Sequence, residues 1–171
     1  MKSKRPESYV IQLALSAVTT ALVFVATWTI RIPNPMGGYF NLGDVMIFIN
    51  ALTFGPVIGG FAGGIGSALA DIIGFPVFAI PTLVIKGIEG LLAGLITNRK
   101  SIYRDVFAVV LAGAEMILGY FLAEYYALGW TFEMALAEIP MTNIPQIIIG
   151  GAIGIPVAII IRKRLPEILK Y

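Results

Sequence analysis

Long apolar segments, each close to the length needed to cross a membrane, set the strongest limit on what this chain can fold into. The first runs from about Tyr9 to Ile30 without a charged residue. A membrane-spanning helix needs about 20 predominantly apolar residues, because the hydrocarbon core of a bilayer is about 30 Å thick. This stretch is longer than the apolar region of a signal peptide, so we expect it to be retained as a first helix.

Five further apolar segments follow, separated by proline, glycine and charged residues that favour loops. The sequence therefore predicts an all-α integral membrane protein, in which residues 1–171 form one transmembrane domain built as a six-helix bundle. Segment 42–54 is short for a full crossing, so it tilts, starts inside the preceding loop or is partly broken. The expected helices cover approximately 8–30, 42–54, 57–73, 82–96, 105–127 and 143–161.

The composition agrees with a membrane protein and excludes several kinds of chemistry. Hydrophobic residues make up 58% of the chain and charged residues 13%, against about 25% charged in soluble domains. The net charge of +2 is too small to indicate a nucleic-acid partner. The chain has no cysteine and no histidine, which removes thiol nucleophiles, Ser-His-Asp triads and cysteine or histidine metal sites. We therefore expect neither an enzyme nor a bound metal or cofactor.

The basic residues are distributed unevenly between the two ends of the expected bundle. With six spans, both termini lie on the same side of the membrane as the connections between helices 2 and 3 and between helices 4 and 5. Only two of the basic residues, Arg31 and Lys86, then lie elsewhere. Cytoplasmic loops of membrane proteins carry an excess of Lys and Arg, so we expect both termini in the cytoplasm. The basic residues on that side are Lys2, Lys4, Arg5, Arg99, Lys100, Arg104, Arg162, Lys163, Arg164 and Lys170.

Five charged residues lie inside the apolar segments, where each is costly unless it is paired or faces a cavity. They are Asp44, Asp71, Lys86, Glu89 and Glu115. Lys86 and Glu89 share a helix face, so one interpretation is a structural ion pair. The other is a polar pocket for a soluble ligand. The expected topology places three of these residues near the outer face, which favours a capture site.

Two further segments carry polar residues that point to the same outer pocket. In the first outer loop, Tyr39 is suited to stack on a flat ligand, and Asn41 and Asp44 to form hydrogen bonds. Asn41 is equally suited to cap the second helix, and both roles are compatible. Asn143 and Gln146 share one face at the start of the last helix, and an inward orientation avoids exposing them to lipid.

Small residues one helical turn apart occur in two segments. The spacing of Gly59 with Gly63, and of Gly60 with Gly64, favours close packing of two helices in lipid. A phosphate-binding loop would require a lysine before Ser67, where the chain has glycine. Ala17 and Ala21 form a similar pair on the first helix, which either packs inside the bundle or presents a smooth face to another subunit.

Several runs resemble the S components of energy-coupling factor (ECF) vitamin importers. The likeness is sharpest over residues 31–95, and length, six spans and charged termini extend it to the rest of the chain. The runs are 31–35 (RIPNP), 38–44 (GYFNLGD), 54–60 (FGPVIGG), 63–71 (GGIGSALAD) and 81–87 (PTLVIKG).

The resemblance implies a multi-pass protein of a prokaryotic plasma membrane that binds a vitamin or its precursor from outside. Such a subunit joins one transmembrane T component and two ATPase subunits to form an ABC importer. The alanine pair that the family uses against the T component matches Ala17 and Ala21. The family's pocket, which is lined by the first outer loop and helices four to six, corresponds here to Asn41, Asp44, Lys86, Glu89, Glu115 and Asn143.

The sequence leaves the ligand open. An aspartate-serine-aspartate loop associated with riboflavin binders is absent, and residues 41–44 (NLGD) are more similar to the subgroup linked to hydroxymethylpyrimidine, pyridoxine or pantothenate. Riboflavin stays among the candidates. A stand-alone ion-coupled carrier, with Asp71, Glu89 and Glu115 as coupling sites, is the alternative function, and a membrane-embedded enzyme is a more distant one.

Overall fold

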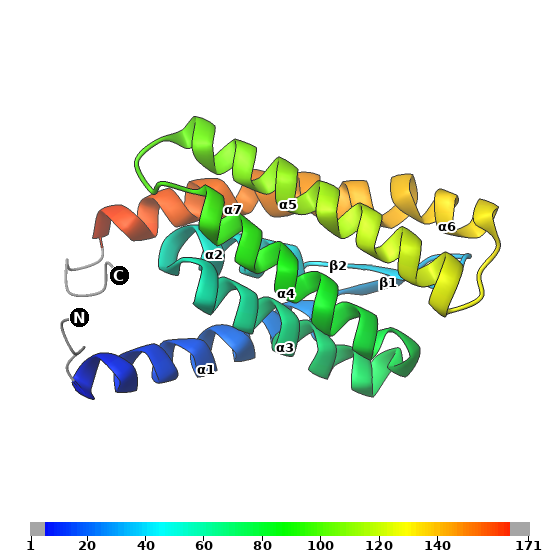
Figure 1. Cartoon of the computed structure of the whole chain (residues 1–171), viewed down its shortest axis with the longest axis horizontal. Helices are drawn as coiled ribbons and strands as arrows, with labels where there is room; N and C mark the ends of the chain where they lie inside the picture. The colour runs from blue at the N-terminus through cyan, green and yellow to red at the C-terminus, as the bar shows by residue number, and fades with distance from the viewer. Residues whose placement is uncertain (1–5, 165–171) are drawn as a thin grey trace.

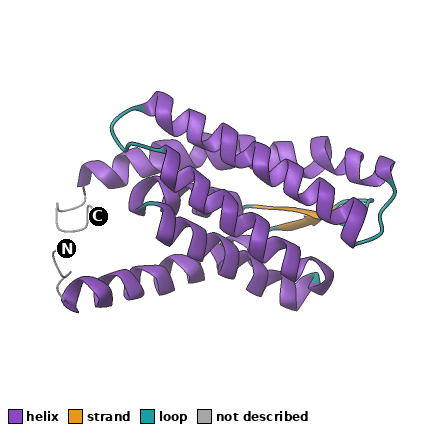
Figure 2. Cartoon of the chain, in the orientation of Figure 1, coloured by secondary structure: helices purple, strands orange, loops and turns teal. Residues whose placement is uncertain are grey.

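The structure, a computed structural model, describes residues 6–164 as a bundle of helices with one small hairpin (Figures 1 and 2). The hairpin pairs β1 (Arg31–Pro33) with β2 (Tyr39–Asn41). Three single turns interrupt or extend the helices: η1 (Pro76–Phe78), and the π-helical turns η2 (Ala123–Ala127) and η3 (Ile139–Asn143). The α-helices are α1 (Pro6–Thr29), α2 (Gly43–Phe54), α3 (Pro56–Gly74), α4 (Ala79–Ile96), α5 (Ile102–Leu122), α6 (Phe132–Glu138) and α7 (Ile144–Arg164).

Five helical segments in the described part of the chain are long and apolar enough to cross a membrane, as expected of a multi-pass bundle. The exception is α2, whose 12 residues reach about 18 Å at 1.5 Å per residue, short of the hydrocarbon thickness. The hairpin and α2 follow one another along the bundle (Figure 1). The second crossing is therefore shared between a hairpin and a short helix.

The outer surface of the bundle is apolar, as a lipid-facing surface must be. Leu13 is 72% exposed, Ile80 78% and Ile148 62%, and these residues lie on three different helices. A soluble protein rarely leaves such large side chains exposed in a continuous surface. The bilayer is the solvent in which this arrangement is favourable.

Glycines allow α3 and α4 to pack with their backbones in contact. A Cβ atom added to Gly59 would lie 2.7 Å from the carbonyl oxygen of Gly90, and one on Gly63 2.5 Å from that of Lys86. Neither distance is compatible with a side chain, so only glycine permits this approach. The structure thus confirms the interpretation of the glycine array as a helix-packing surface.

The start of α1, the end of α7 and the α4–α5 connection lie at one end of the bundle (Figure 1). This end carries Arg99, Lys100, Arg104 and the run 162–164, while Arg31 lies on the hairpin at the other end. The remaining predicted members of the basic group, Lys2, Lys4, Arg5 and Lys170, lie outside the described residues. The cytoplasmic location of the basic end stays a prediction.

The structure differs from the sequence prediction in the segments that connect the expected helices and in where two helices begin. Residues 128–142, expected as a connector, contain α6, whose first turn is capped by the Thr131 side chain accepting from the Met134 N–H. The loop 31–43 contains the hairpin. Helix α4 begins at Ala79 instead of residue 82, because η1 runs directly into it, and α5 begins at Ile102 instead of residue 105.

Candidate functional site

A small polar cavity lies at the hairpin end of the bundle, opposite the basic end. It has a volume of about 30 Å³. The side chains around it come from the hairpin, the end of α3, the start of α4, the end of α5 and the two π-helical turns. The lining residues are Gly38, Tyr39, Asn41, Asp71, Phe78, Thr82, Tyr120, Glu124, Glu138, Thr142, Asn143 and Gln146.

One side of the hairpin is fixed to the end of α3. The Tyr39 hydroxyl donates to Asp71, and the Tyr39 ring stacks on Phe75 with 4.3 Å between centroids. Arg31 adds a cation–π contact, with its guanidinium carbon 5.3 Å from the Tyr39 ring centroid.

The other side of the hairpin is fixed to η3 and its neighbours. The Asn34 side-chain amide donates to Glu138 at 2.5 Å and to Thr142 at 2.7 Å. Gly38 has no room for a side chain, because an added Cβ would lie 2.2 Å from a Glu138 carboxylate oxygen. The hairpin is thus held from both sides and forms one wall of the cavity.

Three of the sequence-predicted binding residues line this cavity: Tyr39, Asn41 and Asn143. Gln146, which was expected to point inward, lines it as well, and its side-chain oxygen accepts from the Asn41 backbone N–H at 3.3 Å. The Asn41 side chain accepts from the Gly43 N–H at 2.8 Å, at the first residue of α2. Asn41 therefore fixes the start of α2 and also lines the cavity, and its role in ligand binding stays a prediction.

The other predicted residues form a layer further into the bundle. Lys86 follows the cavity residue Thr82 by one helical turn. Its ammonium group pairs with Asp44 and lies 3.0 Å from a Glu89 oxygen. All three side chains are buried, which agrees with the structural ion pair considered from the sequence. Glu115 is partly buried on α5, and one of its carboxylate oxygens has no hydrogen bond within residues 6–164.

Two cavity residues have polar atoms that are buried and unsatisfied. The Glu124 Oε2 atom and the Asn143 Nδ2 atom make no hydrogen bond to any residue the structure describes. Glu124 is 1% exposed and Asn143 2% exposed. Leaving a buried polar group unpaired costs about 1–3 kcal/mol. One acceptor and one donor at the same cavity are suited to a ligand that carries both kinds of group.

Sequence reasoning left Glu124 and Glu138 out of the site. The ordinary helical period does not predict their orientation, because each lies in or beside a π-helical turn that inserts an extra residue into the helix. Asp71 was recognised as a costly intramembrane carboxylate, but its link to Tyr39 depends on the hairpin. The available signal was a pair of carboxylates, one just before the connector expected at 128–142 and one within it.

Ala17 and Ala21 are not among the residues that line this cavity. Both are exposed on α1, one helical turn apart. In the described chain they face outward, whereas Thr19 and Val23 of the same helix are buried.

A curated relative matches most of this chain in sequence. A relative from Pyrococcus woesei, described as an uncharacterized protein in gap 3′ region, is 45% identical over 152 residues, which is 86% of this chain and 99% of the relative.

Two solved structures share the fold. The S component for biotin from an ECF-type ABC transporter has a TM-score of 0.67 at 18% identity and covers 94% of both chains. The S component of a bacterial ECF transporter has a TM-score of 0.63 at 21% identity, covering 95% of this chain and 99% of the other. The family model for the S component of the ECF-type riboflavin transporter matches residues 8–165. The chain belongs to this family of ECF S components, which are membrane-embedded transport subunits.

Proposed function

We propose that this chain is the substrate-binding subunit of an ECF-type ABC importer in a prokaryotic plasma membrane, and that it captures a small water-soluble vitamin or vitamin precursor from outside. Residues 1–171 act in this proposal as one transmembrane domain. The observation that carries it is the buried polar cavity with unsatisfied Glu124 and Asn143 atoms at one end of an apolar bundle. An intramembrane cavity of this kind is suited to binding a polar solute.

The side chains around the cavity favour a particular ligand chemistry. Asp71, Glu124 and Glu138 contribute carboxylates, and none of the lining side chains within residues 6–164 belongs to lysine or arginine. A ligand with its own carboxylate, such as pantothenate or biotin, would bring like charges together in a buried site, which is unfavourable. An uncharged or cationic ligand with several N–H or O–H donors fits better.

Aromatic residues narrow the choice to a ligand with a flat ring. Tyr39, Phe78 and Tyr120 line the cavity together with the amides of Asn41 and Asn143. Aromatic side chains bind flat rings by stacking, and the amides supply both donors and acceptors. Riboflavin has a ring with one N–H and two carbonyls, and a chain of hydroxyl groups. Together with the description of the family, this makes riboflavin our first candidate, ahead of hydroxymethylpyrimidine and pyridoxine.

A vitamin cannot enter the cavity without rearrangement of its walls. The volume of about 30 Å³ compares with about 300–1,000 Å³ for sites that bind small molecules. In our proposal the hairpin moves away from the end of α3 and from η3 to admit the ligand. Tyr39, Asn41 and Asn143 then contact the ligand directly, and the deeper residues Asp44, Lys86, Glu89 and Glu115 lie beneath it.

The test is to identify the ligand and measure its affinity. Mass spectrometry of the purified protein should detect riboflavin or a related vitamin, and flavin fluorescence should be quenched on titration with ligand-free protein. Pantothenate and biotin serve as carboxylate-bearing controls and should not compete. Binding of pantothenate with no binding of riboflavin would contradict the ligand assignment. Failure to bind any of these vitamins would contradict the proposed function.

The proposed partners are one T component and two ATPase subunits, with Ala17 and Ala21 on α1 contacting the T component. Two exposed small residues one turn apart permit close contact with another helix. Ala17→Trp should keep ligand affinity and lose co-purification with the T component, whereas Ile148→Trp, on the exposed face of α7, should keep both. Normal assembly of Ala17→Trp would contradict this contact. Uptake into liposomes without the ATPase subunits would favour the stand-alone carrier instead.

A further inference from the structure

A second, much larger pocket lies at the basic end of the bundle and is not explained by vitamin binding. Its volume is about 610 Å³, and it lies between the α4–α5 connection, the end of α2 and the last turns of α7. Among the residues that the structure describes, four cationic side chains and one carboxylate line it. These residues are Arg99, Lys100, Arg162, Lys163 and Asp105.

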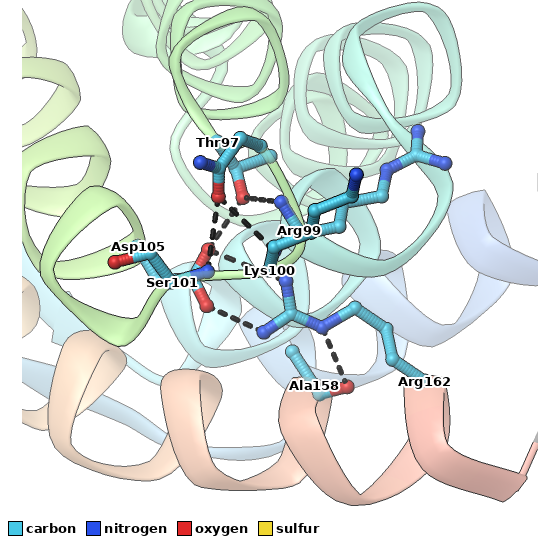
Figure 3. Close-up of polar contacts among 8 residues, drawn as sticks. Thr97, Arg99, Lys100, Ser101, Asp105, Ala158 and Arg162 are labelled. Atoms are coloured by element: carbon cyan, nitrogen blue, oxygen red, sulfur yellow. Dashed lines mark hydrogen bonds and ion pairs between the residues drawn. The ribbon is translucent and has the colours of Figure 1, made fainter.

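The α4–α5 connection is a tight turn fixed by its own side chains (Figure 3). The Thr97 hydroxyl accepts from the Arg99 N–H at 3.1 Å, and the Asn98 side chain accepts from the N–H groups of Lys100 and Ser101 at 3.0 Å each. Arg99 adopts a left-handed conformation with φ of 59°. The turn therefore uses its backbone donors internally and presents the cationic side chains to the pocket.

Arg162 is held in place on the opposite wall (Figure 3). Its guanidinium donates to both oxygens of Asp105, one of them at 3.3 Å, and its Nε atom donates to the Ala158 carbonyl at 3.2 Å. Burial and the nearby charge of Arg162 lower the pKa of Arg99. The positive charges in this pocket thus repel one another, and Asp105 pairs with Arg162.

A buried hydroxyl group also lines the pocket. Thr53, near the end of α2, is 4% exposed, and its Oγ1 atom has no hydrogen-bond partner among the residues that the structure describes. A hydroxyl can donate to an anionic oxygen and would be satisfied by one. Beside it, Ile102 is 53% exposed and lines the same pocket, so an apolar, lipid-facing surface begins at the pocket's edge.

We propose that this pocket binds the phosphate group of an anionic membrane phospholipid. Phosphate oxygens suit the arginine and lysine side chains and the free Thr53 hydroxyl. Basic pockets between transmembrane helices bind such headgroups in other membrane proteins. The exposed Ile102 beside the pocket favours a lipid over a free phosphate compound, because the acyl chains can continue along the apolar surface.

The experiment is native mass spectrometry of the purified protein titrated with phosphatidylglycerol or with phosphatidylcholine. The wild type should retain phosphatidylglycerol preferentially. Lys100→Gln/Lys163→Gln should weaken retention about 30-fold, since each surface cation contributes about 1 kcal/mol. Thr53→Val, which changes no charge, should weaken it about 5-fold through loss of one hydrogen bond.

The matched control is Arg104→Gln/Arg164→Gln, which removes two charges from exposed residues at the same end but outside the pocket. It should retain phosphatidylglycerol nearly as well as the wild type. Equal losses in the two double variants would overturn the proposal, because they would indicate general charge attraction. Displacement of the lipid by equimolar glycerol 1-phosphate would overturn the lipid assignment. Unchanged thermal unfolding of each variant confirms that the comparison is made on folded protein.

Discussion

The two ends of the bundle have opposite chemistry and opposite shape. At the hairpin end, a cavity of about 30 Å³ is lined by three carboxylates and by a hairpin that both neighbouring walls hold in place. At the other end, an open pocket of about 610 Å³ is surrounded by four cations. In our two proposals, the hairpin end binds an uncharged or cationic donor-rich ligand, and the other end binds an anion. The difference also matches the predicted orientation, in which the cationic end lies in the cytoplasm.

A buried layer of charges separates the two ends. Lys86 pairs with Asp44 and Glu89, and the side chains of these three residues are almost fully buried. Each charge in this layer is stabilised by the opposite charge beside it, because an unpaired charge in a low-dielectric interior is strongly unfavourable. We therefore interpret Lys86 as a residue that stabilises the fold beneath the ligand cavity.

The largest expected effect comes from breaking this layer. Lys86→Met leaves two buried carboxylates without a counter-charge and should lower the free energy of unfolding by about 3–5 kcal/mol. Unfolding of the purified protein in mixed micelles measures this quantity. The exposed Lys100→Met is the matched control and should change it by less than about 0.5 kcal/mol.

The same variant distinguishes the two interpretations of Lys86. Asp44→Asn/Lys86→Met should recover part of the lost stability, because one of the unpaired carboxylates is gone. If Lys86→Met is as stable as the wild type but no longer binds the vitamin, Lys86 is a ligand-contacting residue and the structural interpretation fails.

Smaller effects, on vitamin affinity, are expected from substitutions at the cavity, and the loss of a carboxylate should weaken binding more than the loss of an amide. Glu124→Gln removes a buried carboxylate and should weaken vitamin binding about 10- to 100-fold, because a charged hydrogen bond contributes about 1.5–3 kcal/mol. Asn143→Ala removes a neutral donor and should weaken it about 5-fold. Isothermal titration calorimetry gives both affinities. Phosphatidylglycerol retention should be unchanged in both variants, and a parallel loss at the basic pocket would contradict the separation of the two ends.

The sequence was sufficient to predict the bundle, the glycine contact and part of the cavity. Long apolar runs and the distribution of basic residues indicated the crossings, and the inward orientation of Asn143 and Gln146 followed from the cost of exposing amides to lipid. Gly59 and Gly63 pack against α4 as their spacing predicted.

The remainder depended on contacts between residues that are far apart in the chain. Glu124 and Glu138 reach the cavity through π-helical turns, which have no clear sequence signature. The hairpin is fixed by Asn34 with Glu138 and by Tyr39 with Asp71, pairs separated by 104 and 32 positions. Local periodicity carries no information about such pairs. Lys86 and Glu89, which the sequence predicts as binding residues, do not line the cavity in the structure, and their role in binding stays a prediction.

Hydrogen–deuterium exchange with and without riboflavin tests most directly whether the hairpin end is the vitamin site. The account predicts that riboflavin slows amide exchange in residues 31–43 and 123–146, which form walls of the cavity. Residues 97–105 at the basic pocket should exchange at the same rate in both states. Slower exchange in 97–105, with no change at the hairpin, would place the vitamin at the opposite end and contradict the account.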